Sequence, residues 1–220
     1  AEPAAYFKDN AAEWERIRSL HAPDKDVETA ILKRLPQAME KLLDVGTGTG
    51  RMLELLSGRA PRAIGIDVSP DMLAIARDRL LQAGIQNAQV RLGDTYRLPF
   101  PNGAAAANSE KSGFDVVLFH QVLHYLDDPG SAVAEAARVM APGGRLLVAD
   151  FTSHKEEYMR DEFAHRRLGF SDREVEGWFA AAGLSPAGSE TIAPHAEAGE
   201  KLTVKLWLAI AKAKAKNEAA

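Results

Sequence analysis

The sequence contains no cysteine among its 220 residues. This absence excludes disulfide bonds, zinc sites built from thiolates, and a cysteine nucleophile. Small domains often need such cross-links, but a chain of this length buries a substantial core without them. The lack of cysteine fits a reducing compartment, and we therefore expect the protein to be cytoplasmic.

Long apolar runs and an excess of positive charge are missing as well. No stretch of about 18 apolar residues occurs, so we expect no membrane-spanning helix. The 31 acidic residues outnumber the 27 basic residues, which gives a formal net charge of −4. Surfaces that bind nucleic acids usually carry a basic excess, so we expect no direct binding of nucleic acid by this chain.

Short apolar runs alternate with helical patterns along the chain. This alternation predicts an α/β fold, a doubly wound and mostly parallel sheet with crossover helices. Two of the apolar runs, residues 116–119 and 146–148, are nearly continuous, which suits strands covered on both faces. The predicted strands are residues 41–45, 62–67, 88–93, 114–119, 145–151 and 202–210.

Capping residues mark several predicted helix ends. Ser69 suits the cap of a helix that begins with a proline and an acidic residue. Ser171 and Glu174 have the spacing of a capping box. Asn10 is predicted to cap the first of two N-terminal helices, and Pro36 is predicted to stop the second.

A glycine-rich turn follows the first predicted strand, in the sequence LLDVGTGTG at residues 42–50. Glycines let the backbone approach a bound ligand, and such turns lie at the edge of a doubly wound sheet where cofactors bind. Dinucleotide-binding proteins usually carry G-x-G-x-x-G, whereas this turn reads G-x-G-x-G and lacks the Gly-Lys-Ser/Thr of a nucleoside-triphosphate loop. A tight turn without any ligand is the alternative interpretation.

Two acidic residues follow the second and third predicted strands. Asp67 stands about 20 residues after the first glycine, where a carboxylate accepts hydrogen bonds from a ribose diol. Helix capping is the other interpretation of Asp67, but Ser69 suits that role. Asp94 is suited to an adenine amine or to capping a turn.

Together these motifs resemble the class I S-adenosylmethionine-dependent methyltransferases. The resemblance covers residues 41–151 and also rests on LPF at 98–100, FDVVLFHQVLHYL at 114–126 and APGG at 141–144. It implies S-adenosylmethionine as the cofactor and a small-molecule methyl acceptor. It also implies a seven-stranded sheet of order 3-2-1-4-5-7-6, with the last strand antiparallel and helices on both faces.

The resemblance assigns a set of residues to the cofactor, grouped by the part that they hold. The amino-acid part is assigned to Asp44, Gly46, Thr47, Gly48 and Gly50, the methionine end to His120 and Gln121, the ribose and adenine to Asp67, Val68 and Met72, and the adenine edge to Asp94 and Thr95.

The chain then divides into three parts. Residues 1–36 are predicted to form a helical cap, residues 37–211 the Rossmann-like methyltransferase domain, and residues 212–220 a disordered tail. Residues 102–113 are small and polar, which predicts a flexible loop.

Catalytic residues are less clearly marked. Methyl transfer from a sulfonium needs alignment of donor and acceptor, and a general base only when the acceptor must lose a proton. His120, His124 and Tyr125 lie near the expected methyl group and are candidates, but each also suits a packing, cofactor-pocket or capping role. No clustered histidine and carboxylate spacing predicts a metal site.

A narrower resemblance is to methyltransferase domains fused behind arsenic-repressor-type winged-helix regulators. It rests on residues 4–18, 165–172 and 201–209, and it implies an attached winged-helix DNA-binding domain. It leaves open a second function, in which the domain senses S-adenosylmethionine or S-adenosylhomocysteine without catalysis. A homodimer is compatible with either function. A nicotinamide-dependent oxidoreductase is disfavoured by the glycine spacing.

Overall fold

A seven-stranded sheet forms the centre of the protein in the computed structural model, which describes residues 3–103, 113–194 and 202–213. The strand order is β3-β2-β1-β4-β5-β7-β6, and β7 runs antiparallel to both of its neighbours while the other pairs are parallel. This confirms the predicted order and the antiparallel last strand. The strands are β1 Lys41–Val45, β2 Arg62–Asp67, β3 Ala88–Leu92, β4 Phe114–His120, β5 Met140–Phe151, β6 Leu184–Ile192 and β7 Val204–Ala211.

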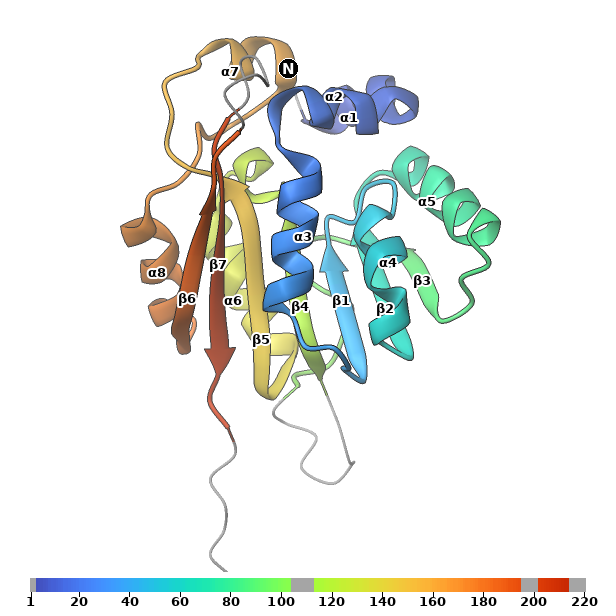
Figure 1. Ribbon diagram of the computed structural model, residues 1–220, viewed down its shortest axis with the longest axis vertical. Helices are drawn as coiled ribbons and strands as arrows, with labels where there is room; N and C mark the ends of the chain where they lie inside the picture. The colour runs from blue at the N-terminus through green and yellow to red at the C-terminus, as the bar shows by residue number, and fades with distance from the viewer. Residues whose placement is uncertain (1–2, 104–112, 195–201, 214–220) are drawn as a thin grey trace, which may run out of the picture.

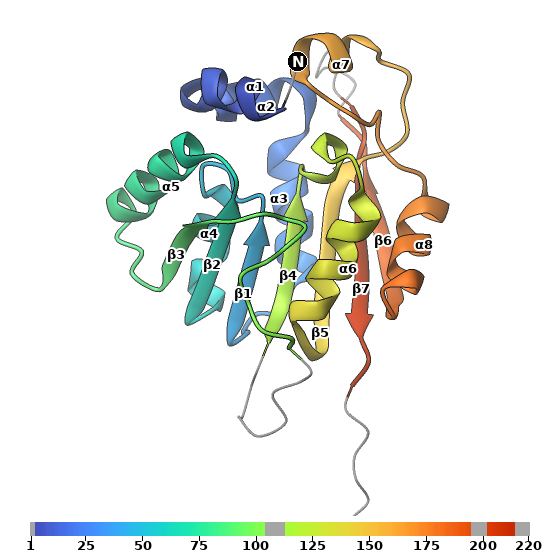
Figure 2. The same cartoon turned by 180° about the vertical axis from the view of Figure 1, so that it is seen from behind.

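Helices cover both faces of this sheet. On one face lie α3 (Asp24–Arg34), α4 (Arg51–Leu56) and α5 (Pro70–Gln82), as Figure 1 shows. On the other lie α6 (Pro129–Val139) and α8 (Asp172–Ala181), seen from behind in Figure 2. Side chains of a strand alternate between its faces. Leu118 of β4 therefore enters the core under α3 and α4, and its neighbour Phe119 enters the core under α6 and α8.

The N-terminal segment lies across the carboxyl ends of the parallel strands (Figure 1). It consists of α1 (Pro3–Asn10), the 3-10 turn η1 (Ala11–Glu13) and α2 (Trp14–His21). Trp14 packs on Met72 of α5 in a small apolar cluster. The helix α3 belongs instead to the main core through Val27 and Ile31. The predicted cap boundary at residue 36 stays a prediction.

Three predicted helix ends can be compared with the structure. Ser69 caps α5, since its hydroxyl accepts a hydrogen bond from the backbone N–H of Met72 at 3.3 Å. Ser171 and Glu174 form both bonds of the predicted capping box on α8. The predicted cap at Asn10 is wrong, because the residues before it are already helical and its amide donates back to the carbonyl of Tyr6 at 2.9 Å.

Two strands differ from the sequence predictions by more than one or two residues at an end. β5 begins at Met140, five residues before the predicted start at residue 145, because Met140 pairs with Phe114 across a bulge. β6 has no predicted counterpart. It lies at the sheet edge with most of its residues exposed, and a register irregularity follows Pro186. An exposed edge strand carries little apolar alternation and tolerates proline.

The remaining short elements are η2 (Ser57–Arg59), η3 (Leu123–Tyr125) and α7 (Tyr158–Phe163). Most of the predicted loop at 102–113, and the predicted tail beyond residue 213, lie outside the described residues. Within the parts that the structure describes, no helix is long and apolar enough to cross a membrane.

The capping box gives a first stability prediction. Replacing Ser171 with Ala removes the acceptor for the N–H of Glu174, and we expect a loss of about 1 kcal/mol in the free energy of unfolding. Urea denaturation measures it. Ser185→Ala, at an exposed position of β6, is the control and should change stability by less than about 0.5 kcal/mol. Equal effects of the two changes would contradict the prediction.

Candidate active site

The glycine-rich turn leads from β1 into α4 with a backbone that favours glycine. Gly46 has φ of 73°, and a Cβ there would lie 2.5 Å from a methyl carbon of Val122. Gly50 has φ of 80°, and a Cβ there would lie 3.1 Å from the Cβ of Ala76 on α5. The turn therefore approaches two other segments closely. Only glycine, which has no Cβ, permits that approach at positive φ.

A cavity of about 360 Å³ opens beside this turn. Its walls come from the carboxyl ends of β1, β2 and β4 and from the N-terminal helices, with Phe7, Trp14 and Arg18 contributing from the latter. Except for Gly50, every residue assigned to the cofactor lines this cavity, namely Asp44, Gly46, Thr47, Gly48, Asp67, Val68, Met72, Asp94, Thr95, His120 and Gln121. Gly50 instead lets α4 pack against α5.

Asp44 lies on the cavity wall at the end of β1 and is almost fully buried. The hydroxyl of Thr47 donates to its Oδ2 at 2.6 Å, whereas Oδ1 has no hydrogen-bond partner among the described residues. Burial raises the pKa of Asp44 to about 7; the hydrogen bond from Thr47 opposes this shift, and the charge of Asp67 adds to it. The site thus holds a carboxyl oxygen that lacks a partner.

Asp67, at the end of β2, joins the glycine-rich turn to the segment that follows. Its Oδ2 accepts the N–H of Gly48 at 2.8 Å and its Oδ1 accepts the N–H of Ser69 at 2.9 Å. Burial raises the pKa of Asp67, and these backbone hydrogen bonds oppose the shift. Each carboxylate oxygen has a further lone pair for a ligand.

The outer end of the cavity has a mixed polar and apolar character. Val68 lines it with 53% of its surface exposed. Asp94 lines it too, although its Oδ1 accepts the N–H of Tyr96 at 2.9 Å in a turn. The alternative turn-capping role of Asp94 is therefore also present.

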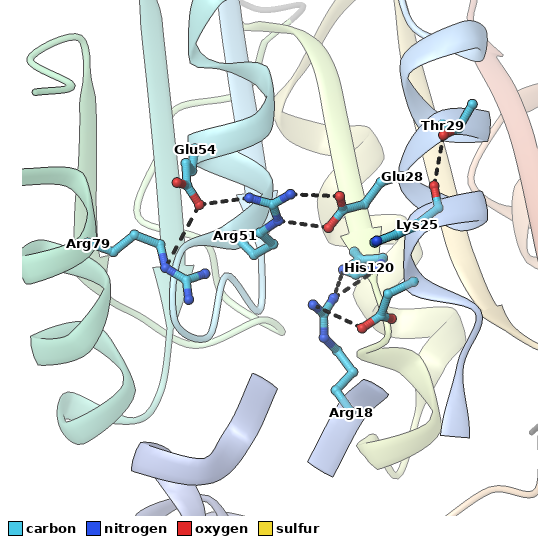
Figure 3. A network of polar contacts seen from close by, with 9 residues as sticks. Arg18, Lys25, Glu28, Thr29, Arg51, Glu54, Arg79 and His120 are labelled. Carbon is cyan, nitrogen blue, oxygen red and sulfur yellow. Dashed lines mark hydrogen bonds and ion pairs between the residues drawn. The ribbon is translucent and has the colours of Figure 1, made fainter. Parts of the chain in front are cut away.

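Arg18 is a site residue that the sequence analysis missed. It reaches into the cavity from α2, and its side chain is 8% exposed. Its Nη1 lies 3.2 Å from Nδ1 of His120, a residue that Figure 3 places beside Arg18. Its Nη2 lies 3.5 Å from a carboxylate oxygen of Asp24. The available signal was its spacing, because Arg18 follows Trp14 by one helical turn and so shares its face.

His120 is held uncharged by this environment. Burial lowers its pKa well below the ordinary value, and the charges of Arg18 and Arg51 act in the same direction. Neutral imidazole offers one acceptor nitrogen, which the guanidinium of Arg18 uses. His120 is therefore poorly suited to accept a proton from a substrate.

A charged network joins the helices beside the turn (Figure 3). Arg51, the first residue of α4, makes two hydrogen bonds of 2.7 Å to Glu28 of α3 and one of 2.9 Å to Glu54. Arg79 of α5 lies 3.9 Å from the same carboxylate of Glu54. These carboxylates neutralise Arg51, so the network ties α3 to the start of α4.

Aromatic rings from the N-terminal helices close the cavity. Phe7 and Tyr125 meet edge to face with ring centroids 4.8 Å apart, and Trp14 lies 6.1 Å from the ring of Tyr125. Burial raises the pKa of Tyr125 well above its ordinary value, and the charges of Tyr6 and Asp150 add to the shift. Its hydroxyl stays protonated at neutral pH, so Tyr125 is not suited to be a base.

His124 lies outside this cavity, unlike the other two catalytic candidates. It lines a neighbouring pocket of about 20 Å³, and its Nδ1 is 2.7 Å from Oδ1 of Asp150 on β5. Among the residues that the structure describes, no three histidines or carboxylates lie close enough together to hold a metal ion.

Comparison with known proteins finds a family match for the central part of the chain. Residues 43–148 match the model of the methyltransferase domain family. The chain is 39% identical over 138 residues to the demethylmenaquinone methyltransferase of Thermus thermophilus, covering 62% of this chain and 58% of the relative. It is 31% identical over 163 residues to the ubiquinone biosynthesis O-methyltransferase of Thiobacillus denitrificans, covering 72% and 66%. The chain thus spans less than two thirds of either relative.

Solved structures share the whole fold at lower sequence identity. The N-methyltransferase NodS of Bradyrhizobium japonicum, solved with S-adenosyl-L-homocysteine, is 19% identical with a TM-score of 0.73, covering 96% of this chain and 99% of that one. A SAM-dependent methyltransferase from Aquifex aeolicus is 22% identical with a TM-score of 0.66, covering 89% and 97%. Residues 43–148 thus match the methyltransferase domain family, and the sheet order and the solved structures show that the chain has the fold of S-adenosylmethionine-dependent methyltransferases.

Proposed function

We propose that the chain transfers the methyl group of S-adenosylmethionine to a small organic acceptor. One observation carries this proposal: a single cavity gathers the residues of the glycine-rich turn, the acids after β2 and β3, and the aromatic side chains of the N-terminal helices. The two relatives described above are named a demethylmenaquinone methyltransferase and a ubiquinone biosynthesis O-methyltransferase, which supports a small-molecule acceptor. When bound, S-adenosylmethionine supplies a methyl group activated by a positively charged sulfur.

The amino-acid end of the cofactor fits the inner end of the cavity. The unpartnered Oδ1 of Asp44 is suited to accept a hydrogen bond from an ammonium group. The guanidinium of Arg18, which faces the same cavity, is suited to a carboxylate. Thr47 and Gly48 line the space between them and β2. This end therefore brings an acidic and a basic side chain to the cofactor, with Asp24 also close to the guanidinium of Arg18.

The nucleoside end fits the outer part of the cavity. Asp67 is suited to the ribose diol through its remaining lone pairs, and Val68 and Met72 are suited to the faces of the adenine ring. Asp94 and Thr95 lie where they can meet the adenine edge.

The residues around the methyl position have an aligning and excluding role. Methyl transfer is an in-line displacement, so holding donor and acceptor in register supplies much of the rate. Phe7, Trp14 and Tyr125 cover the inner cavity and exclude water from it. His120 and Gln121 line the methionine end.

Calorimetry with purified protein tests the proposed cofactor. We expect S-adenosylhomocysteine to bind and NAD not to compete with it. Dinucleotide-binding proteins hold a pyrophosphate at the N-terminus of the helix that follows the glycine-rich turn. Here the carboxylates of Glu28 and Glu54 neutralise Arg51 at that position of α4. Release of S-adenosylhomocysteine from S-adenosylmethionine across a panel of small acceptors then tests turnover. Tight NAD binding without binding of the sulfur cofactors would contradict the proposal.

Asp67 gives a second prediction. We expect Asp67→Ala to weaken S-adenosylhomocysteine binding by about 1–3 kcal/mol, the range for hydrogen bonds to a charged group. It should also lower stability, since it removes acceptors for the N–H groups of Gly48 and Ser69. Calorimetry and urea denaturation measure the two effects. Asp71→Ala, which removes an exposed carboxylate of α5 outside the cavity, is the control. Unchanged affinity in Asp67→Ala would leave Asp67 with a structural role alone.

A sensor without catalysis remains the alternative function. It rests on the narrower resemblance to domains attached to winged-helix regulators, and it shares the cofactor site described above. Failure of every acceptor to release S-adenosylhomocysteine, with intact cofactor binding, would favour the sensor. The attached DNA-binding domain, a homodimer and a cytoplasmic location stay predictions.

A further inference from the structure

A small second pocket adjoins the main cavity beneath the N-terminal helices. Its volume of about 20 Å³ is enough for one water molecule or one hydroxyl group. Trp14, Arg18, Gln121 and Tyr125 line both spaces and so form the wall between them. The main cavity and the second pocket therefore adjoin across these four side chains.

His124, which lines this pocket, forms a buried pair with Asp150. The Nδ1 of His124 lies 2.7 Å from Oδ1 of Asp150, and both side chains are at most 2% exposed. The backbone N–H of Phe151 donates to the same Oδ1 at 2.8 Å, and the N–H of His124 lies 3.4 Å from Oδ2. A carboxylate that accepts these bonds fixes the proton of His124 on Nδ1, which leaves Nε2 as an acceptor.

Two complementary polar atoms then face the pocket without partners. Neither Nε2 of His124 nor the amide Nε2 of Gln121 has a hydrogen-bond partner among the described residues. Gln121 also has φ of 58°, a left-handed conformation that costs energy for a residue with a side chain. Buried polar groups are nearly always satisfied, so an unpaired acceptor and an unpaired donor at one small pocket indicate a ligand. A hydroxyl group satisfies both at once.

We propose that this pocket takes the hydroxyl group of an aromatic acceptor, with His124 as the general base and Gln121 as the donor to the hydroxyl oxygen. This inference rests on the proposed methyl transfer and names its acceptor class. The ring of such an acceptor fits the aromatic surround of Phe7, Trp14 and Tyr125 in the main cavity. Arg18 in the shared wall favours the anion that forms there over a cationic acceptor.

The reaction balances without a further reactant. The hydroxyl proton moves to Nε2 of His124, whose positive charge Asp150 stabilises. The acceptor oxygen uses a lone pair to form the bond to the methyl carbon, and the bond from that carbon to sulfur breaks with its electron pair going to sulfur. The proton on His124 then passes to solvent when the products leave. His120 and Tyr125 cannot replace His124, because the first already accepts from Arg18 and the second keeps its own proton.

Binding of 4-nitrocatechol to the protein saturated with S-adenosylhomocysteine tests the base directly. The anion of this compound absorbs at longer wavelength than the neutral form, and its first ionisation lies near neutrality. At about pH 6 we expect the ratio of anion to neutral 4-nitrocatechol to be roughly tenfold higher when the compound is bound to the parent than when it is free in solution. When the compound is bound to His124→Gln, we expect it to be mainly neutral. The ionisable groups facing His124 are Asp150, Tyr125, Arg18, His120, His154 and His165. The control is therefore His154→Gln, which changes a half-buried histidine outside both pockets.

Turnover with two acceptors adds a second readout. His124→Gln should slow methylation of catechol by about 100-fold or more, the usual share of a general base. It should slow methylation of 4-nitrocatechol far less at about pH 8, where that compound is already ionised. Gln121→Asn tolerates the left-handed backbone but withdraws the donor, and we expect it to weaken 4-nitrocatechol binding about fivefold. Melting temperature checks the folding of each variant.

The outcomes separate this inference from the proposed function. If the parent and His124→Gln bound the same fraction of 4-nitrocatechol as the anion, His124 would have a structural role. The same would follow if His124→Gln slowed methylation of catechol and of 4-nitrocatechol equally. If the parent bound S-adenosylhomocysteine but neither catechol, the acceptor class would be wrong while the cofactor site stood. If His124→Gln failed to fold, a Gln121→Asn variant with unchanged 4-nitrocatechol affinity would overturn the inference by itself. Failure of the parent to bind S-adenosylhomocysteine would contradict methyl transfer altogether.

Discussion

Replacing Asp44 with Asn is expected to weaken S-adenosylhomocysteine binding by about 2–4 kcal/mol, roughly 30-fold to 1,000-fold. The carboxylate has one oxygen bonded to Thr47 and one without a partner, which we assign to the ammonium group of the cofactor. Asn keeps the shape and an acceptor for Thr47 but loses the charge. Calorimetry with S-adenosylhomocysteine measures the loss, and 5′-methylthioadenosine, which lacks the amino-acid part, is the matched ligand whose affinity should change little.

The raised pKa of Asp44 makes this binding pH-dependent. With a pKa of about 7 in the free protein, the carboxyl is mostly neutral below neutrality, and binding an ammonium group then requires loss of its proton. Affinity for S-adenosylhomocysteine should therefore rise between about pH 6 and 8 and level off above. The dependence should vanish in Asp44→Asn. A dependence that persists in this variant would assign it to another group.

The raised pKa of Asp44 also predicts that the stability of the fold decreases with rising pH, whereas the affinity for S-adenosylhomocysteine increases. The folded state holds the proton of Asp44 more tightly than the unfolded chain does, so this residue lowers stability as pH rises from its ordinary pKa of 3.8 to about 7. Above neutrality Asp44→Asn should therefore unfold at a higher urea concentration than the parent, and at about pH 4 the difference should fade. A variant that gains stability while it loses binding would identify Asp44 as a functional residue whose burial costs the fold.

The central strands could be predicted from sequence because both of their faces are buried. In β1 and β2 the observed bounds equal the predicted ones, since apolar residues fill each strand and a turn signal follows it. β6 could not be predicted, because an edge strand with Pro186 and exposed polar residues resembles a loop. Its pairing with β7 is a tertiary interaction that its own residues do not encode.

The cofactor residues were predictable for a related reason. Asp44 and Asp67 stand at strand ends next to glycine-rich or capping sequence, so their spacing along the chain fixes their place on the sheet edge. Their bonding partners were not predictable: nothing in the sequence indicates that Asp67 also holds the N–H of Gly48. Gly50 belongs to the motif but packs α4 against α5 instead of lining the cavity.

The residues that close the site are brought together by the packing of segments that are distant in the sequence. His124 and Asp150 are separated by 26 positions and meet only because η3 lies beside β5. Arg18 meets His120 across 102 positions, when α2 folds over the ends of the strands. Pattern along the chain places such residues on a helix face but cannot say what that face covers.

Arg18→Met is expected to weaken S-adenosylhomocysteine binding by about 1.5–3 kcal/mol, roughly 10-fold to 150-fold. The guanidinium faces the cavity with its side chain 8% exposed, and we assign it to the carboxylate of the cofactor. A charged hydrogen bond in such a dry site is strong, because water competes weakly for it. Met retains most of the length and the apolar stem, so the change removes charge while it keeps packing against the N-terminal helices.

Calorimetry with two ligands separates charge from shape. S-adenosylhomocysteine carries the carboxylate and 5′-methylthioadenosine does not, so Arg18→Met should lower affinity for the first and leave the second within about twofold. Arg18→Lys keeps the charge and should fall between Arg18→Met and the parent, since an ammonium lacks the planar fork of a guanidinium. Arg16→Met is the matched control on the same helix, where the arginine side chain is 66% exposed and pairs with Glu13. Equal weakening of both ligands by Arg18→Met would mean that Arg18 acts by shaping the cavity through His120.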